Sequence, residues 1–190
     1  FLFLLFVFVF FFIYSLKLDY ILNIMIEKYK KILILISFIV TLFTINSYSN
    51  DIKKIQIIKD NYFIDTLELH DFEKNLVLLK DKKASYYLLN FWASWCAPCI
   101  KEMKSLDNLQ KKEARIRVIT ISQDNNIELA KKFFIENSYT NLEKYFDIDK
   151  KVLSFFNIRG LPTTFIVNKD FKVFAKVEGI IEWDRKRFIN

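Results

Sequence analysis

The order of hydrophobic and polar positions along residues 50–190 predicts alternating strands and helices. An almost continuous apolar run over residues 86–92 is typical of a strand buried on both faces of a sheet. Pro98 follows and favours a helix start, because the N–H that proline lacks is not needed in a first helical turn. We expect this helix to continue to about Glu113. One of its faces carries Cys99, Met103, Leu106 and Gln110.

The alternation continues to the end of the chain. Further strands are predicted at 117–121, 144–146, 164–167 and 171–177. A helix is predicted where the run Asn125–Glu128 supplies an N-cap with a glutamate three residues later. Its apolar face carries Leu129, Ala130, Phe133 and Phe134. Shorter helices are predicted at about 150–156 and 182–189, and a strand or hairpin within 50–85. The pattern predicts an α/β fold with a mixed central sheet flanked by helices.

The first 49 residues do not show this alternation. Residues 1–16 are uncharged and rich in phenylalanine, and residues 32–45 form a second apolar stretch. The second stretch is short for a permanent membrane helix, which needs about 20 apolar residues. Because residue 1 is Phe and a methionine follows at position 25, we expect residues 1–24 to lie upstream of the true start. A two-segment membrane hairpin is the alternative.

From Met25 the chain follows the order of a secretory signal. A basic cluster comes first, then the apolar stretch 32–45, then small residues at 47 and 49. The basic cluster consists of Lys28, Lys30 and Lys31. We therefore expect residues 25–49 to be a signal peptide or a membrane anchor, and residues 50–190 to form one exported domain.

The charge of the chain argues against one class of function. The chain carries 29 Lys and Arg against 22 Asp and Glu. The first 49 residues hold four lysines and two acidic residues, which leaves 25 basic against 20 acidic side chains for the domain. Nucleic-acid binding would need a basic stripe on a recognisable fold, and the sequence shows none. We expect lysine-rich solvated surfaces and no nucleic-acid partner.

The candidate chemistry centres on Cys96 and Cys99, the only cysteines in the chain. A dithiol separated by two residues can cycle with a disulfide. Zinc normally needs three or four protein ligands, and His70 is the only histidine, so we expect no metal site and no cofactor. His70 itself is interpreted as a surface residue. A structural disulfide that never turns over is the alternative to a redox-active pair.

The motifs around this pair resemble those of the thioredoxin superfamily, and within it the TlpA/ResA-like membrane-associated thiol–disulfide oxidoreductases. The matching runs are Trp-Ala-Ser-Trp-Cys-Ala-Pro-Cys at 92–99, Glu-Met at 102–103 and Gly-Leu-Pro-Thr-Thr at 160–164. The resemblance spans roughly residues 62–189 and implies a thioredoxin-like fold. It also leads us to expect an N-terminal strand extension and one strand–helix pair inserted between Cys99 and Pro162.

Cys96 is expected to be the nucleophile and Cys99 the resolving thiol. Cys96 precedes the predicted helix, where unpaired N–H groups and the helix dipole favour a thiolate. Glu102 lies three residues after Cys99 on the same helix face, so a buried Glu102 could exchange the proton of Cys99. The resemblance implies the same role for Glu102. Thioredoxins proper carry their buried acid at the place of Asn90. The alternative for Glu102 is an ordinary solvated glutamate on the helix surface.

The resemblance also implies substrate-binding residues beside the pair. Pro162 is expected to follow a cis peptide bond, with the backbone of Leu161 offering hydrogen-bonding groups to an extended substrate segment. Trp95 and Pro98 are expected to contact partners at the surface, whereas Trp92 should pack in the core. A trans proline in an ordinary turn is the alternative for Pro162.

Together these expectations describe an exported oxidoreductase that reduces disulfides of partner proteins at the periplasmic or other extracytoplasmic face of a bacterial inner membrane. The resemblance implies apocytochrome c or a copper-site protein as substrate and a membrane thiol protein as electron donor. Residues 32–45 would attach the protein to the membrane if they are retained. A disulfide oxidase or isomerase of the same fold is one alternative, because the motif alone does not fix the direction of exchange. A copper-handling assembly factor that binds Cu(I) through both thiolates is the other.

Overall fold

The computed structural model describes residues 22–42 and 54–185. The chain divides into two units, residues 1–50 and residues 51–190. The described part of the first unit is a helix over residues 22–42 with exposed side chains. No helix within the described residues combines the length and the apolar character needed to cross a membrane. Residues 1–21 and 43–49 of the predicted leader lie outside the described residues, so the signal peptide or anchor stays a prediction.

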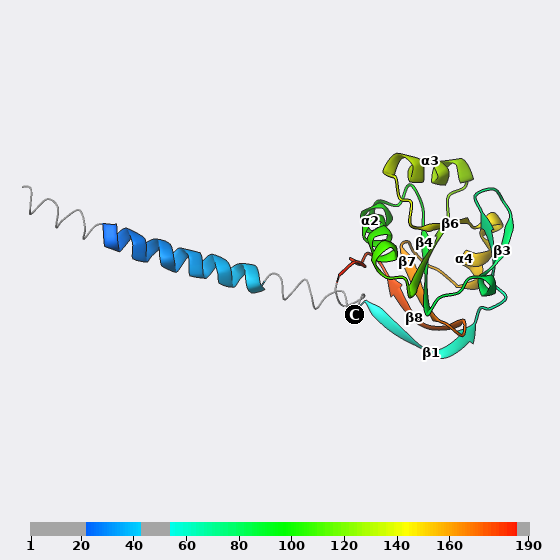
Figure 1. Cartoon of the computed structure of the whole chain (residues 1–190), viewed down its shortest axis with the longest axis horizontal. Coiled ribbons are helices and arrows are strands. Elements are labelled where there is room, and N and C mark those ends of the chain that lie inside the picture. Colours follow the sequence, from blue (N-terminus) through cyan, green and yellow to red (C-terminus); the bar gives the residue numbers. More distant parts are fainter. Residues whose placement is uncertain (1–21, 43–53, 186–190) are drawn as a thin grey trace, which may run out of the picture. The chain divides into compact units, whose positions relative to one another are not determined.

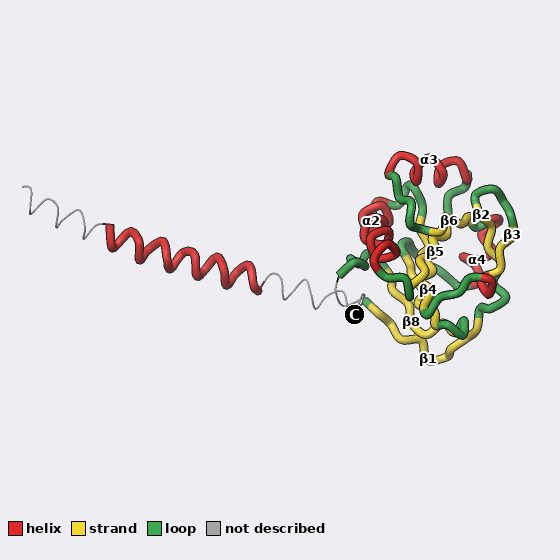
Figure 2. Tube along the Cα trace, in the orientation of Figure 1, coloured by secondary structure: helices red, strands yellow, loops and turns green. Residues whose placement is uncertain are grey.

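The second unit is built on one mixed sheet of eight strands, traced in Figures 1 and 2. The order of the strands across the sheet is β1-β8-β7-β4-β5-β6-β2-β3. Strands β4, β5 and β6 run parallel, whereas every other neighbouring pair is antiparallel. The strands are β1 (Ile55–Phe63), β2 (Glu68–Asp71), β3 (Leu76–Leu78), β4 (Tyr86–Trp92), β5 (Ile116–Ser122), β6 (Glu143–Phe146), β7 (Thr163–Asn168) and β8 (Lys172–Glu178).

Residues 54–185 of this unit contain three α-helices and two short 3-10 helices. The helices are α2 (Ala97–Lys112), α3 (Ile127–Asn137) and α4 (Lys151–Phe155), and the 3-10 turns are η1 (Leu79–Asp81) and η2 (Ile148–Lys150). In Figure 1, α3 lies at the top of the domain, α2 at the left and α4 at the right. Buried residues of α2 and α3 share one hydrophobic core, and Val152 of α4 belongs to another. The predicted mixed sheet with flanking helices is confirmed.

The side chains of β4 alternate between two hydrophobic cores, as the period of a strand requires. Leu88 and Trp92 pack into one core, which also contains buried residues of α2 and α3. Leu89 and Phe91 pack into the other, which reaches Phe156 at the end of α4. Because both faces of β4 are covered, this strand has the continuous apolar sequence from which it was predicted. It holds the segment after Trp92 at a fixed place in the domain.

The residues before β4 extend the sheet at both edges. Strand β1 pairs with β8, and the hairpin of β2 and β3 pairs with β6 at the opposite edge. The sequence predicted a strand or a hairpin in this region, and the structure contains a strand, β1, as well as a hairpin of β2 and β3. Between α3 and β7 the chain adds β6 and α4, which correspond to the expected inserted strand–helix pair.

Three local predictions were wrong. The N-cap of α3 is Asn126, whose side chain accepts from the N–H of Glu128 two residues later. Leu129 is 48% exposed, because it lies in the first turn of α3 at the edge of the buried strip. The predicted C-terminal helix is absent from its described part: residues 183–184 form a turn and residue 185 a bend, and 186–190 lie outside the described residues. The N–H of Trp183 donates to Ser105 Oγ at 3.1 Å, so contacts with α2 override the local helical pattern here.

Candidate active site

Cys96 ends a tight turn between β4 and α2 and serves as the N-cap of that helix. Its N–H donates to the carbonyl of Ala93 at 3.1 Å, and its Sγ accepts from the N–H of Cys99 at 3.3 Å. Pro98 fits into the first turn of α2, as predicted. Cys96 and Cys99 form a disulfide with an S–S distance of 2.04 Å. The structure is therefore the oxidised form of the pair.

The two cysteines differ in their access to solvent. Cys96 is 5% exposed and lines a surface groove, whereas Cys99 is fully buried among the side chains of the α2 core. A partner that enters the groove meets the sulfur of Cys96 first. The helix N-terminus at Cys96 also favours negative charge on this sulfur once the disulfide is reduced. The roles predicted for the two thiols are consistent with this geometry.

The groove beside Cys96 has a volume of about 680 Å³. One side comes from the turn and the start of α2, including Trp95 and Pro98, and the other from the loop before β7, including Leu161. Trp95 is 67% exposed, so its indole can cover a bound segment. Four of the residues predicted from the sequence thus line one groove. Its charged lining residues are Lys150 and Arg159, both basic.

Pro162 follows a cis peptide bond with Leu161, as predicted. Pro162 is buried, and its carbonyl accepts from the N–H of Gly179 at 2.9 Å. Leu161 is only half-buried. Neither backbone group of Leu161 forms a hydrogen bond within the part of the chain that the structure describes. Leu161 therefore offers a free donor and a free acceptor at the groove.

Glu102 is 1% exposed and lies one helical turn after Cys99. Oε1 accepts from Asn90 Nδ2 at 2.8 Å. Oε2 accepts from the N–H of Ile181 at 3.2 Å and from Trp183 Nε1 at 3.3 Å. Burial raises the pKa of Glu102 from 4.5 to about 7, although these donors oppose the shift. Glu102 is thus not a solvated glutamate, and its carboxyl can gain or lose a proton near neutral pH.

A second buried carboxylate fixes the turn before Cys96. Asp124 is fully buried, and its oxygens accept from the N–H of Ser94 at 3.1 and 3.2 Å and from Ser94 Oγ at 2.7 Å. Ser122 Oγ donates to the same carboxylate at 2.9 Å. Lys150 Nζ donates to the carbonyl of Asp124 at 2.8 Å. Asp124, two residues after the end of β5, therefore holds the backbone of Ser94, which lies two residues before the reactive Cys96.

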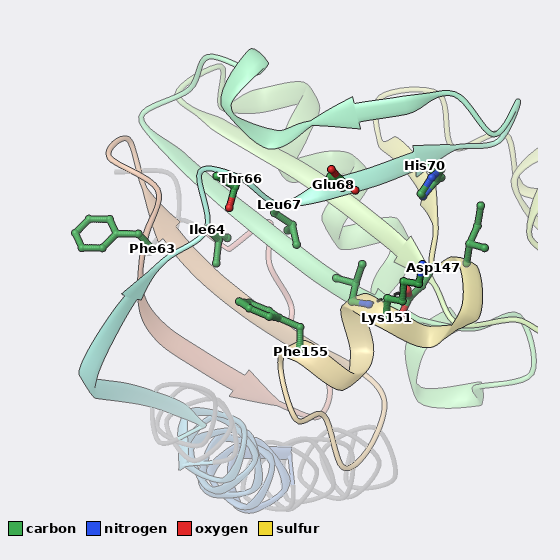
Figure 3. Close-up of a pocket in the computed structure, with 11 residues that line it drawn as sticks. Phe63, Ile64, Thr66, Leu67, Glu68, His70, Asp147, Lys151 and Phe155 are labelled. Atoms are coloured by element: carbon green, nitrogen blue, oxygen red, sulfur yellow. Dashed lines mark hydrogen bonds between the residues drawn. The ribbon is translucent and has the colours of Figure 1, made fainter.

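A separate hollow lies between β2 and α4 and is drawn in Figure 3. Its volume is about 360 Å³, and apolar side chains such as Leu67 and Phe155 line it. His70 lies on its rim, half-buried, and none of the predicted site residues reaches it. Within the described residues, no three side chains of His, Cys, Asp and Glu are grouped as a metal site requires.

Sequence reasoning missed several residues that contact the site, because each of them is far along the chain from the residue to which it bonds. Asp124 lies 30 residues from Ser94, and Ile181 and Trp183 lie 79 and 81 residues from Glu102. None belongs to a motif around the cysteines. Asn90, noted only as the place of the thioredoxin acid, is the partner of Glu102. Asn90 is a polar residue inside an otherwise apolar strand, and this was the one feature of the sequence that could have indicated a buried polar partner such as Glu102.

Comparisons with known proteins identify the family of the chain. Residues 62–176 match the AhpC/TSA family. The thiol-disulfide oxidoreductase ResA of Bacillus cereus (strain ZK / E33L) is 34% identical over 133 residues, which cover 68% of this chain and 73% of the relative.

Two solved structures are similar as well. The thioredoxin domain of a thiol-disulfide oxidoreductase of Bacteroides vulgatus has a TM-score of 0.55 at 25% identity, covering 68% of this chain and 96% of that one. The exposed lipoprotein thioredoxin of Streptococcus pneumoniae strain TIGR4 has a TM-score of 0.56 at 26% identity, covering 62% and 92%. With the Cys-Ala-Pro-Cys disulfide at the start of α2, these findings show that the chain belongs to the AhpC/TSA family, has a thioredoxin-like fold and is a thiol–disulfide oxidoreductase of the ResA type.

Proposed function

We propose that this oxidoreductase is exported and reduces disulfides of selected partner proteins, with apocytochrome c before haem attachment as the first candidate and a copper-site protein as the second. The observation that carries the exchange chemistry of this proposal is the buried carboxyl of Glu102, one helical turn after the buried Cys99. A resolving thiol that is closed to water needs a proton acceptor inside the protein, and a pKa of about 7 suits Glu102 to that task.

The reaction begins with the reduced protein. The thiolate of Cys96 attacks one sulfur of the substrate disulfide, which forms a mixed disulfide and releases the first substrate thiolate. Glu102 then accepts the proton of Cys99. The Cys99 thiolate attacks Cys96 Sγ, which releases the second substrate thiolate and forms the disulfide seen in the structure. The substrate gains two electrons and the protein loses two, which a membrane thiol protein would resupply.

Export rests on the order of residues from Met25 and on one structural relative. A basic cluster, an apolar stretch and small residues follow one another as in a secretory signal. The similar pneumococcal thioredoxin is described as an exposed lipoprotein. Outside the cytoplasm the surroundings are oxidising, so a protein that works as a reductant there needs its own electron source.

The reduction potential tests the direction of exchange. We expect equilibration of the full chain with glutathione to give a value near that of thioredoxin, about −270 mV, and far from the roughly −120 mV of a dedicated oxidase. In the host, loss of the gene should abolish holocytochrome c formation, and a small exogenous thiol should restore it. Restoration by an oxidant instead, or a potential near that of the oxidase, would assign the protein to disulfide formation.

A further inference from the structure

Gln123 lies directly after β5 and lines the same groove as Cys96. The residue is 4% exposed and both polar atoms of its side chain are buried, yet neither Nε2 nor Oε1 has a hydrogen-bond partner within the described residues. A buried polar group without a partner is costly, so native proteins keep few of them. The primary amide of Gln123 is therefore expected to pair with a group that joins the groove.

The backbone of Gln123 is held by hydrogen bonds, whereas its carboxamide forms none within the described residues. Its N–H donates to the carbonyl of Trp92 at 2.7 Å, and its own carbonyl accepts from Lys150 Nζ at 2.7 Å. These two bonds tie the residue to the end of β4 and to the start of α4. A new bond from the carboxamide to a group in the groove would therefore break neither of these two backbone bonds.

The chemistry of the groove indicates what the amide would bind. A carboxamide donates and accepts at the same time, which matches the C=O and N–H of one extended peptide segment. The backbone of Leu161, in the same groove, also has an unused donor and acceptor. We propose that the carboxamide of Gln123 binds the backbone of the substrate segment beside its reactive cysteine, so that Gln123 and Leu161 hold the segment together. This inference rests on the proposed function in taking a protein disulfide as the substrate.

Gln110 provides a matched control. It is a half-buried glutamine whose two polar groups are already paired inside the domain: Nε2 donates to the carbonyl of Ile116 at 3.0 Å, and Oε1 accepts from the N–H of Val118 at 2.6 Å. Replacement of Gln110 by Leu should lower the melting temperature, because it leaves backbone groups unpaired. Gln123→Leu should hold or raise the melting temperature, because it removes unpaired polar atoms.

The experiment compares two substrates of the reduced full chain. One is a short peptide whose single cysteine is in a mixed disulfide with a chromogenic aromatic thiol, and the other is the symmetric disulfide of that thiol without a peptide. Release of the aromatic thiolate gives the second-order rate constant for each. We expect Gln123→Leu to lower the ratio of the peptide rate to the small-disulfide rate about tenfold, as two lost hydrogen bonds would. Gln110→Leu should keep the wild-type ratio.

Methylation of the peptide backbone identifies the group that is bound. N-methylation at a residue flanking the cysteine should slow the wild type and slow Gln123→Leu much less. If Gln123→Leu keeps the wild-type ratio of the peptide rate to the small-disulfide rate, this inference alone is overturned. Gln123→Met replaces Gln123→Leu in this test if the first variant does not fold. Equal rate constants of the wild type for both substrates would overturn it together with the proposed preference for protein disulfides.

Discussion

Asn90 donates a 2.8 Å hydrogen bond from Nδ2 to Oε1 of Glu102 and so joins the central strand β4 to the active-site helix α2. The same Nδ2 also donates to Thr164 Oγ1 at 2.9 Å, while Asn90 Oδ1 has no partner among the described residues. Every polar contact recorded for the Glu102 carboxyl comes from a donor. These donors favour the carboxylate and burial favours the acid, and the balance between them places the pKa near 7.

Replacement of Glu102 by Gln should slow the resolving step. The variant has no group to accept the proton of Cys99, so release of substrate from the mixed disulfide should fall by about 10²-fold at pH 7. The initial attack by Cys96 should not change. Stopped-flow measurement of the two phases across pH 5 to 9 checks this, and the resolving phase of the wild type should rise with an apparent pKa near 7.

The amide of Asn90 makes Glu102→Gln a mild change in structure. If the Asn90 amide rotates, its unpaired Oδ1 can accept from the new Gln Nε2, and the single Gln oxygen can still accept from the N–H of Ile181 and from Trp183 Nε1. Glu128→Gln is a suitable control, because Glu128 is an exposed residue of α3 outside the site. Equal resolving phases in all three proteins would remove Glu102 from the mechanism.

Glu102 should also make stability depend on pH in a predictable direction. Its folded pKa of about 7 lies above the ordinary 4.5, so the folded protein binds this proton more tightly than the unfolded chain. The stabilising contribution is complete below pH 4.5 and is lost as pH rises to about 7. Its full size is on the order of 3 kcal/mol.

Urea unfolding of the wild type and of Glu102→Gln measures this effect, because other carboxyl groups titrate in both proteins and cancel. The stability of the wild type relative to the variant should fall by about 3 kcal/mol between pH 4 and pH 8. A difference that is independent of pH would mean that the carboxyl of Glu102 titrates as it does in the unfolded chain.

The sequence was most informative where its pattern is local. The buried strand β4 and the helix α2 follow from apolar runs and from one proline, and both were predicted to within one residue of their bounds. The cysteine pair, the surface position of Trp95 and the cis bond before Pro162 followed from short motifs. In these cases the information lies within a few neighbouring residues.

The rest of the site depends on contacts that no local pattern encodes. The sequence near residue 182 has the pattern of a helix, yet Trp183 lies in a turn. The N–H of Ile181 is bonded to Glu102, and that of Trp183 to Ser105. Asp124 and Gln123 follow a strand, as surface polar residues often do, and the structure shows both to be buried at the active site. Their positions depend on how β4 and β5 pair, which the sequence alone does not reveal.

Asp124 should position the turn that carries Cys96. Asp124→Asn replaces one acceptor oxygen by a donor that faces the N–H and hydroxyl groups of Ser94 and Ser122, so we expect a loss of about 1–3 kcal/mol in the free energy of unfolding. Attack by Cys96 on a small disulfide should also slow, because the turn loses its fixed geometry.

Asp107→Asn is the matched control for this change. Asp107 binds the N–H and side-chain amide of Asn141 in an exposed loop contact and has no bond to the cysteine turn. The Asp107→Asn variant should lose less than about 1 kcal/mol in the free energy of unfolding. Its Cys96 should attack a small disulfide at the wild-type rate. Rates that fall equally in the two variants would show that Asp124 has no special effect on the turn.

Cys99→Ser should trap substrates, because it separates attack from resolution. Cys96 lines the groove and can still form a mixed disulfide, but no thiol remains to release the partner. The trapped complex should migrate as a larger species that collapses on addition of reductant. Cys96→Ser should trap little, because Cys99 is fully buried in the core of the domain. Equal trapping by both variants would contradict the assigned roles.

The identity of the trapped partners decides between the proposed directions. Apocytochrome c or a copper-site protein would support a reductase with few substrates, and a broad set of exported proteins would support an oxidase or isomerase.

The Cys99→Ser variant also tests the role of the groove in binding. Adding Gln123→Leu to Cys99→Ser should reduce the amount of trapped protein, whereas adding Gln110→Leu should not. Because trapping needs only binding and the first attack, this result does not depend on Glu102, and it measures recognition separately from proton transfer.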